Sequence, residues 1–150
     1  MTLRLAKFLP LAALLLRAAT ASAAAQTNFS TNAPIINFRL PTFTPKGNRE
    51  WLVRGSEARI LSQDLIDIRE LTLTVFKGDA TEHVDTMILS PAARVQPSTA
   101  VATGDATIRV LNDDFEVTGI NWRYDHRQKR VSIAKDVHVV FKAELKDYLK

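Results

Sequence analysis

The stretch FEVTGINWRYD, residues 115–125, alternates apolar and polar side chains in two different phases. The apolar residues are Phe115 and Val117 before Gly119, and Ile120, Trp122 and Tyr124 after it. Alternation with period two predicts a half-buried β-strand, and a slip of one residue turns every later side chain to the opposite face. A β-bulge at Gly119 would absorb the slip, because an extra residue bends the strand and glycine suits that position. The stretch therefore predicts a bent strand whose two halves face one curved interior.

The same change of phase occurs earlier, in IDIRELTLTVF, residues 66–76. A separation of 49 positions pairs Ile66 with Phe115, Ile68 with Val117, Leu71 with Ile120, Leu73 with Trp122, Val75 with Tyr124, Gly55 with Gly104 and Asp64 with Asp113. This correspondence indicates an internal repeat, in which Arg69 and Glu70 supply the first bend without a glycine. Repeated bending of antiparallel strands predicts an all-β, bent antiparallel β-jellyroll with an apolar interior. An ordinary β-sandwich with two unrelated phase changes is the alternative.

The N-terminus combines Arg4 and Lys7, an apolar run over residues 8–16 and small residues up to Ala25. This order is typical of a cleavable secretory signal peptide, which we place at residues 1–25. A membrane anchor is the alternative, but the run is shorter than the ~20 residues that cross a bilayer, and Pro10 and Arg17 interrupt and end it. We therefore expect an exported, periplasmic protein.

Residues 26–48 contain Pro34, Pro41, Pro45 and Gly47 and show little periodicity, so we expect an extended N-terminal arm there. Residues 49–150 carry the strand patterns of the jellyroll domain, and the end FKAELKDYLK either forms a short C-terminal helix or follows a last strand. Without residues 1–25 the chain has 150 − 25 = 125 residues, with 17 Lys and Arg against 16 Asp and Glu. This balance gives a nucleic-acid partner no support, because such binding needs a basic face.

Cysteine is absent, which excludes thiol catalysis, iron–sulfur clusters and cysteine-based zinc sites. His83, His126 and His138 are scattered without metal-ligand spacing, so we expect surface or edge residues and no metal or cofactor. A secreted hydrolase would need one of these histidines to converge with carboxylates in a pocket, and no nucleophile motif or phosphate loop is present. The sequence therefore predicts no enzyme.

The basic run RYDHRQKR, residues 123–130, joins two strand patterns. Residues 125–129 are expected to form a polar hairpin connection exposed to solvent. Asp64, Asp113 and Asp114 likewise lie in short turns, where carboxylates accept hydrogen bonds from the local backbone.

Three stretches resemble a known family: LPTFTPKGNREWLVRGSEARIL, VATGDATIRVLNDDFEVTGINWRYDHRQKRVSI and the closing KDVHVVF. Together they make most of the chain similar to the periplasmic lipopolysaccharide-export proteins LptC and LptA, which share the OstA-like β-jellyroll. The resemblance implies a protein that binds lipopolysaccharide and passes it from the inner toward the outer membrane, with an inner-membrane transporter complex among its partners. LptC is held by an N-terminal membrane helix, whereas this N-terminus looks cleavable, so LptC-like and LptA-like roles both stay open.

In that family a hydrophobic groove receives the acyl chains, and neighbouring proteins join edge to edge. The residues that we expect to line the groove are Leu73, Val75, Phe115, Val117, Ile120, Trp122, Ile133, Val139 and Phe141. The expected partner edge is the last strand, made of Val137, His138, Val139, Val140 and Phe141, because only the charged tail KAELKDYLK follows it. Further candidates, for contact with lipopolysaccharide phosphates, are Arg123, Arg127, Lys129 and Arg130.

A secreted β-sandwich that binds carbohydrate or protein on its surface is the alternative of a different class. It would expose a row of aromatic side chains, whereas the transport hypothesis encloses aromatics such as Trp122 and Tyr124 in an apolar interior. The position of the aromatic side chains therefore separates the two hypotheses.

Overall fold

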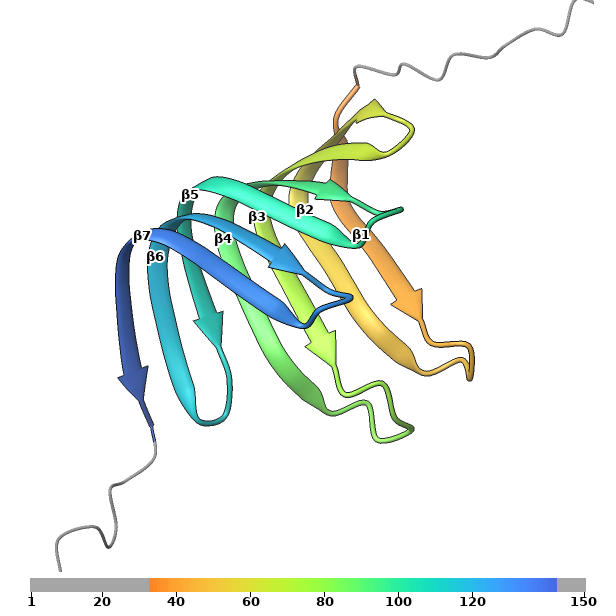
Figure 1. Cartoon of the computed structure of the whole chain (residues 1–150). Coiled ribbons are helices and arrows are strands. Elements are labelled where there is room, and N and C mark those ends of the chain that lie inside the picture. Colours follow the sequence, from red (N-terminus) through yellow and green to blue (C-terminus); the bar gives the residue numbers. More distant parts are fainter. Residues whose placement is uncertain (1–32, 143–150) are drawn as a thin grey trace, which may run out of the picture.

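The computed structural model describes residues 33–142, and every regular element in that range is a β-strand. The strands are β1 (Ile35–Phe43), β2 (Arg49–Ser62), β3 (Leu65–Phe76), β4 (Val84–Gln96), β5 (Val101–Leu111), β6 (Phe115–Asp125) and β7 (Arg130–Phe141). Each strand pairs antiparallel with the next, so the order in the sheet is the order in the chain. The sheet stays unclosed, with β1 and β7 as its edges (Figure 1). The predicted all-β, bent antiparallel fold is confirmed.

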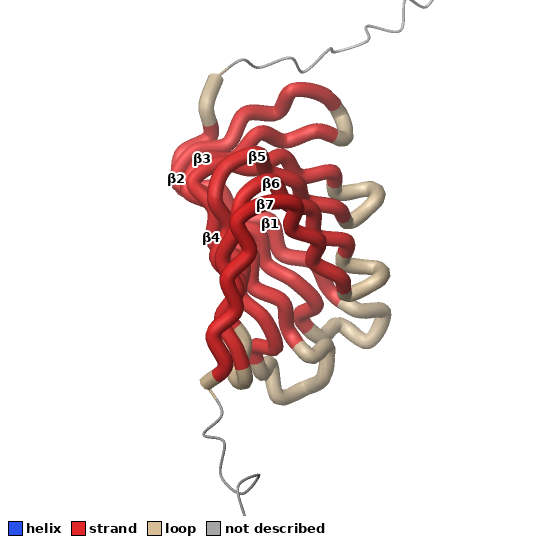
Figure 2. The backbone as a smooth tube through the Cα atoms, turned by 60° about the vertical axis from the view of Figure 1, so that its left-hand side comes forward, coloured by secondary structure: helices blue, strands red, loops and turns tan. Residues whose placement is uncertain are grey.

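The strands fold back on themselves, which gives the single sheet two layers (Figures 1 and 2). The lower layer of Figure 1 ends in the loops at residues 44–48, 77–83 and 112–114, and the upper layer ends in the loops at residues 63–64, 97–100 and 126–129. Four non-glycine residues within the strands have positive φ at the bend: Asn37, Glu70, Asn121 and Asp136. Such residues interrupt the regular alternation of side chains, and apolar residues of both layers therefore face one interior.

Gly55 and Gly104, which correspond in the repeat, both lie at the bend beneath a large side chain of the neighbouring strand. A Cβ on Gly104 would lie 2.6 Å from Nε1 of Trp122, and a Cβ on Gly55 would collide with Cγ2 of Ile68. The two repeat units form the hairpins β2–β3 and β5–β6. Because β2 and β5 are three positions apart in an antiparallel sheet, the units run in opposite directions, and their turns lie at opposite ends of the sheet (Figure 1).

The register changes at Gly119, but the extra residue belongs to the other strand. The pairing of β6 with β7 shifts between Thr118 and Ile120, where Gly119 alone faces Asp136 and Val137. Pairing with β5 continues without interruption from Thr118 through Ile120. The bulge is therefore in β7, not in β6 as the sequence pattern suggests.

The backbone conformation of β6 also differs from the expectation. Gly119 is not among the residues of positive φ in the described chain, and Asn121, two residues later, has φ 59°. Glycine is required at position 119 because Cγ2 of Ile133 lies against its backbone. In the first repeat unit the expectation holds, since Glu70 has φ 52° and supplies the bend without glycine.

One apolar cluster fills the space between the layers. Its largest buried members include Trp51, Ile68, Leu71, Leu73, Ile88, Ile108, Trp122 and Tyr124. Trp51, Trp122 and Tyr124 are each no more than 3% exposed. The bulkiest aromatic side chains are thus enclosed, as the transport hypothesis expects, and do not form a surface row.

The segment expected to form an arm contributes the first strand of the sheet. β1 pairs with β2 along its length, and Phe38 and Leu40 pack against the core. Pro41 is accommodated because β1 is an edge strand, where a missing N–H is tolerated. The sheet therefore begins at Ile35. The predicted signal peptide at residues 1–25 and the predicted C-terminal helix lie outside the described residues, and residues 33–142 contain no helix long and apolar enough to cross a membrane.

Candidate binding groove

A cavity of about 490 Å³ lies between the two layers near β6 and β7. Its lining consists of Val75, Asp85, Thr86, Val110, Phe115, Val117, Tyr124, Lys129, Arg130, Val131, Ile133 and Val137. The lower layer supplies Val75, Val110 and Val117, and the upper layer supplies Val131 and Ile133. Because both walls carry branched aliphatic side chains, the cavity suits a hydrocarbon chain.

Four of the nine predicted groove residues, Val75, Phe115, Val117 and Ile133, line this cavity. Leu73 and Trp122 are fully buried in the core, where they support the wall. The prediction omits Val110 and Val131, although the same alternation identifies them. Val110 follows Ile108 at spacing two in β5, and Val131 precedes Ile133 at the same spacing in β7.

Ile120 lies on the other face of the sheet. Its neighbour Gly119 faces Ile133 in the interior, and successive residues of a strand point to opposite faces. Ile120 accordingly lines a separate cavity of about 720 Å³ on the outer face, together with residues such as Leu89. The structure thus differs from the prediction for Ile120, because the phase of β6 changes at Asn121 and not at Gly119.

The groove is open on the side of β7. Val139 and Phe141 stand opposite Val117 and Phe115 in the register of the sheet, and so on the interior face. They are nevertheless 47% and 73% exposed, and Val137 is exposed as well. The predicted partner edge, residues 137–141, is the end of this edge strand. Contiguous exposed apolar side chains on an edge strand mark a surface suited to a partner or a ligand.

A buried polar cluster joins the β6–β7 turn in the upper layer to the start of β2 in the lower layer. His126 is 4% exposed, and its ring stacks on Trp51 with the centroids 5.2 Å apart and the planes at 13°. Its Nε2 lies 3.0 Å from Oε1 of Glu50, and its Nδ1 lies 2.9 Å from the hydroxyl of Tyr124. These contacts hold the two layers together across the interior.

Both ring nitrogens of His126 have a polar partner. Nε2 faces the Glu50 carboxylate and lies 3.1 Å from Nζ of Lys129, and Nδ1 faces the Tyr124 hydroxyl. Burial lowers the pKa of His126, although the hydrogen bond with Glu50 opposes the shift. Burial, together with the nearby charge of Asp85, raises the pKa of Tyr124. Both side chains are therefore neutral at pH 7.

The expectation that all three histidines lie at the surface or edge is wrong for His126. His83 and His138 are exposed, and the polar connection between β6 and β7 spans residues 126–129, one residue shorter than the predicted 125–129 because Asp125 ends β6. His126 is buried because Trp51 and Glu50 cover it, and these residues are about 75 positions away in the chain. A composition-based prediction of a hairpin turn contains no such information.

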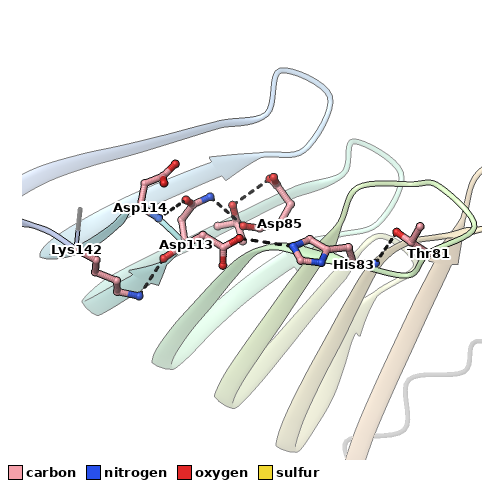
Figure 3. A network of polar contacts seen from close by, with 8 residues as sticks. Thr81, His83, Asp85, Asp113, Asp114 and Lys142 are labelled. Atoms are coloured by element: carbon pink, nitrogen blue, oxygen red, sulfur yellow. Dashed lines mark hydrogen bonds and ion pairs between the residues drawn. The ribbon is translucent and has the colours of Figure 1, made fainter. Parts of the chain in front are cut away.

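A second polar network connects the lower loops at the surface (Figure 3). Nε2 of His83 lies 3.6 Å from a carboxylate oxygen of Asp113, and the side-chain amide of Asn112 donates to the carbonyl of Asp85 at 2.9 Å. Nζ of Lys142 donates to the carbonyl of Asn112, also at 2.9 Å. The network fixes the end of β7 against the β5–β6 turn. Across residues 33–142 no group of three or more His, Cys, Asp or Glu side chains is placed to hold a metal ion.

The fold and the cavity define a class: an all-β protein with one unclosed, bent sheet and a cavity with aliphatic walls between its layers. The chain belongs to the LptC-related family of lipopolysaccharide-assembly proteins, whose family model matches residues 16–142. None of the curated proteins matches the chain. Membership makes it a component of lipopolysaccharide transport, from a family of periplasm-associated transport and binding proteins and not a known enzyme family.

Proposed function

We propose that this chain binds lipopolysaccharide with acyl chain in the cavity between its layers and passes it on from the inner toward the outer membrane. The observation that supports the proposal is an apolar cavity that opens toward the exposed apolar side chains of β7. Each methylene group transferred from water to such walls contributes about 0.8 kcal/mol, so a long acyl chain gains substantial affinity without any polar contact. The site of action is the periplasm, reached after removal of the signal peptide predicted at residues 1–25.

The handover uses the free edge of β7. The backbone N–H of Lys142 donates to the carbonyl of Asp114 at 2.8 Å, so this N–H points toward β6. Because backbone groups alternate along a strand, the N–H groups of Phe141 and Val139 point away from β6. They are free to pair with a strand of the next export protein, which would extend the apolar surface from one protein to the next.

Site-specific photocrosslinking tests the proposal. A photoreactive residue placed at Val117 or Ile133 faces the cavity, and one placed at Thr118 lies on the opposite face of the same strand as Val117. We expect lipopolysaccharide adducts from Val117 and Ile133 and none from Thr118, in variants whose circular dichroism matches that of the unsubstituted protein. Adducts that form mainly from Thr118 would contradict the cavity as the lipid site.

A further inference from the structure

The lining of the cavity crosses the lower layer from β6 to β3 and stops there. Phe115 of β6, Thr86 of β4 and Val75 of β3 belong to the lining. Val75 pairs with Thr86 of β4 on one side and with Trp51 of β2 on the other. Thr86 lines the cavity and Trp51 does not, so along this row the cavity ends between β3 and β2.

The contact between Trp51 and His126 closes the interior at this point. Trp51 belongs to the lower layer and His126 to the β6–β7 turn of the upper layer, and their rings stack with the centroids 5.2 Å apart. Both side chains are buried, at 2% and 4% exposure. Because the two rings are in contact and come from opposite layers, a hydrocarbon chain lying between the layers cannot continue past them.

Polar contacts hold His126 in this position. Nε2 of His126 lies 3.0 Å from Oε1 of Glu50 in β2, and Nδ1 lies 2.9 Å from the hydroxyl of Tyr124 in β6. The backbone N–H of His126 donates to the carbonyl of Ala100 at 3.0 Å, which ties the β6–β7 turn to the β4–β5 turn. Tyr124 is itself part of the cavity lining. The ring that closes the interior is therefore joined directly to the wall of the cavity.

The other end of the cavity is open. Val117 of β6 stands opposite Val139 of β7, which is 47% exposed, and within residues 33–142 no further strand follows β7. A hydrocarbon chain can thus project from the cavity at β7, whereas its other end meets the stacked rings.

Resting on the function proposed above, we propose that Trp51 and His126 form an end stop, which limits the length of the acyl chain that the cavity can enclose. The chain lies across the strands, with its terminal methyl group toward Val75 and Trp51 and its head-group end toward β7. Trp51 and His126 are then specificity-determining residues, because they decide how many methylene groups of a bound chain are removed from water.

The spacing of the strands sets the size of the effect. The distance from β3 to β2 is about 4.8 Å, which corresponds to about four methylene groups at the ~1.2 Å per bond of an extended chain. Each methylene group that becomes enclosed raises the affinity about fourfold. Opening the end stop should therefore lengthen the preferred chain by up to about four carbon atoms.

The test measures the binding of lauric, myristic, palmitic and stearic acids to the full chain by isothermal titration calorimetry, below the concentration at which each acid forms micelles. His126→Ala removes the upper ring, Trp51→Phe shortens the lower one, and His126→Phe keeps a ring but no polar contact. Trp122→Phe is the matched control, because Trp122 is the other tryptophan of the chain, is 3% exposed and lies outside the lining. Thermal melts confirm that each variant is folded.

We expect the affinity of the unsubstituted protein to rise about fourfold per methylene group and to level off within the series. In His126→Ala, and to a smaller extent in Trp51→Phe, the rise should continue to longer acids. His126→Phe should keep the original limit, because a ring again fills the space between the layers. Trp122→Phe should keep it as well.

Three results would overturn the end stop: the same limit in His126→Ala, Trp51→Phe and the unsubstituted protein, an equal loss of affinity for every acid in both variants, or no binding of any acid. None of them affects the lipopolysaccharide adducts at Val117, which test the proposed function separately. Absence of those adducts from the unsubstituted protein would contradict the proposed function, even if the acids showed the expected limit.

Discussion

Gly104→Ala is the substitution that tests most directly how the bend is built. A Cβ at this position would lie 2.6 Å from Nε1 and 2.8 Å from Cε2 of Trp122, and 2.9 Å from the carbonyl oxygen of Ala92. The indole cannot easily move away, since it is buried and its N–H donates to Oγ of Ser90 at 3.3 Å. Oγ of Ser90 in turn donates to the carbonyl of Thr107 at 2.8 Å. The added methyl group therefore displaces either the ring or the neighbouring strand.

Three contributions set the expected change in the free energy of unfolding. Overpacking a well-filled core costs about 1–3 kcal/mol, and loss of the indole hydrogen bond costs about 1 kcal/mol. Gly104 does not have positive φ, so alanine fits its backbone conformation and regains about 0.4–1 kcal/mol by restricting the unfolded chain. We expect a net loss of about 2 kcal/mol, which lowers Tm by roughly 8 °C in a domain of this size.

Urea denaturation followed by far-UV circular dichroism measures this loss. The matched background is Trp122→Leu, which removes the ring that the new methyl group would meet. In that background Gly104→Ala should cost much less than in the unsubstituted protein, because the two sites are coupled through one contact. Equal cost in both backgrounds, or a Gly104→Ala protein as stable as the original, would refute the close approach of Trp122 as the reason for glycine.

Two further predictions concern pH and the free edge. The folded state holds His126 at a pKa below its ordinary value of 6.5, so the unfolded chain binds more protons as the pH falls through 6.5, and the free energy of unfolding should decrease there. Urea titrations between about pH 7 and 5 should show this decrease in the unsubstituted protein and in the control variant His83→Asn. A decrease of the same size in His126→Asn would contradict the prediction. Proline at Val139 removes an N–H that points away from β6 and should reduce crosslinking to the neighbouring export protein, with stability nearly unchanged. Proline at Val140 should instead weaken the β6–β7 pairing and lower Tm, and equal partner binding in a folded Val139→Pro protein would place the contact elsewhere.

The bend could be predicted from the sequence, but its exact position could not. The phase change in β6 limits the bend to a few residues, and glycine looks like the natural place for it. In the structure Asn121 adopts the positive φ, which asparagine tolerates better than most residues. Gly119 is needed for a different reason, the contact with Ile133, and that contact depends on the pairing of two strands. Placing the phase change at Gly119 instead of Asn121 also assigns the side chain of Ile120 to the wrong face of the sheet.

The lining of the cavity was partly predictable from the alternation of apolar and polar residues. Alternation identifies which residues face the interior, and it correctly includes Val117 and Ile133. It does not say how far the opposite layer extends, and so it gives the same weight to a buried Leu73 and to an exposed Phe141. The burial of His126 is also beyond local patterns, because its partners belong to β2.

The cavity is enclosed on the side of β2 and open on the side of β7, because β7 is an edge strand. Trp51 of β2 reaches across the interior and stacks on His126, so the layers are tied together at that point. β7 contributes only valines and Phe141 at its end, and no further strand of residues 33–142 covers them. A ligand in the cavity would therefore be enclosed toward β2 and accessible toward β7. Within residues 33–142 the outer edge of β7 pairs with no strand, so the open side of the cavity and the edge available to a partner belong to the same strand. A partner that pairs with this edge would cover Val139 and Phe141 and continue the apolar wall of the cavity.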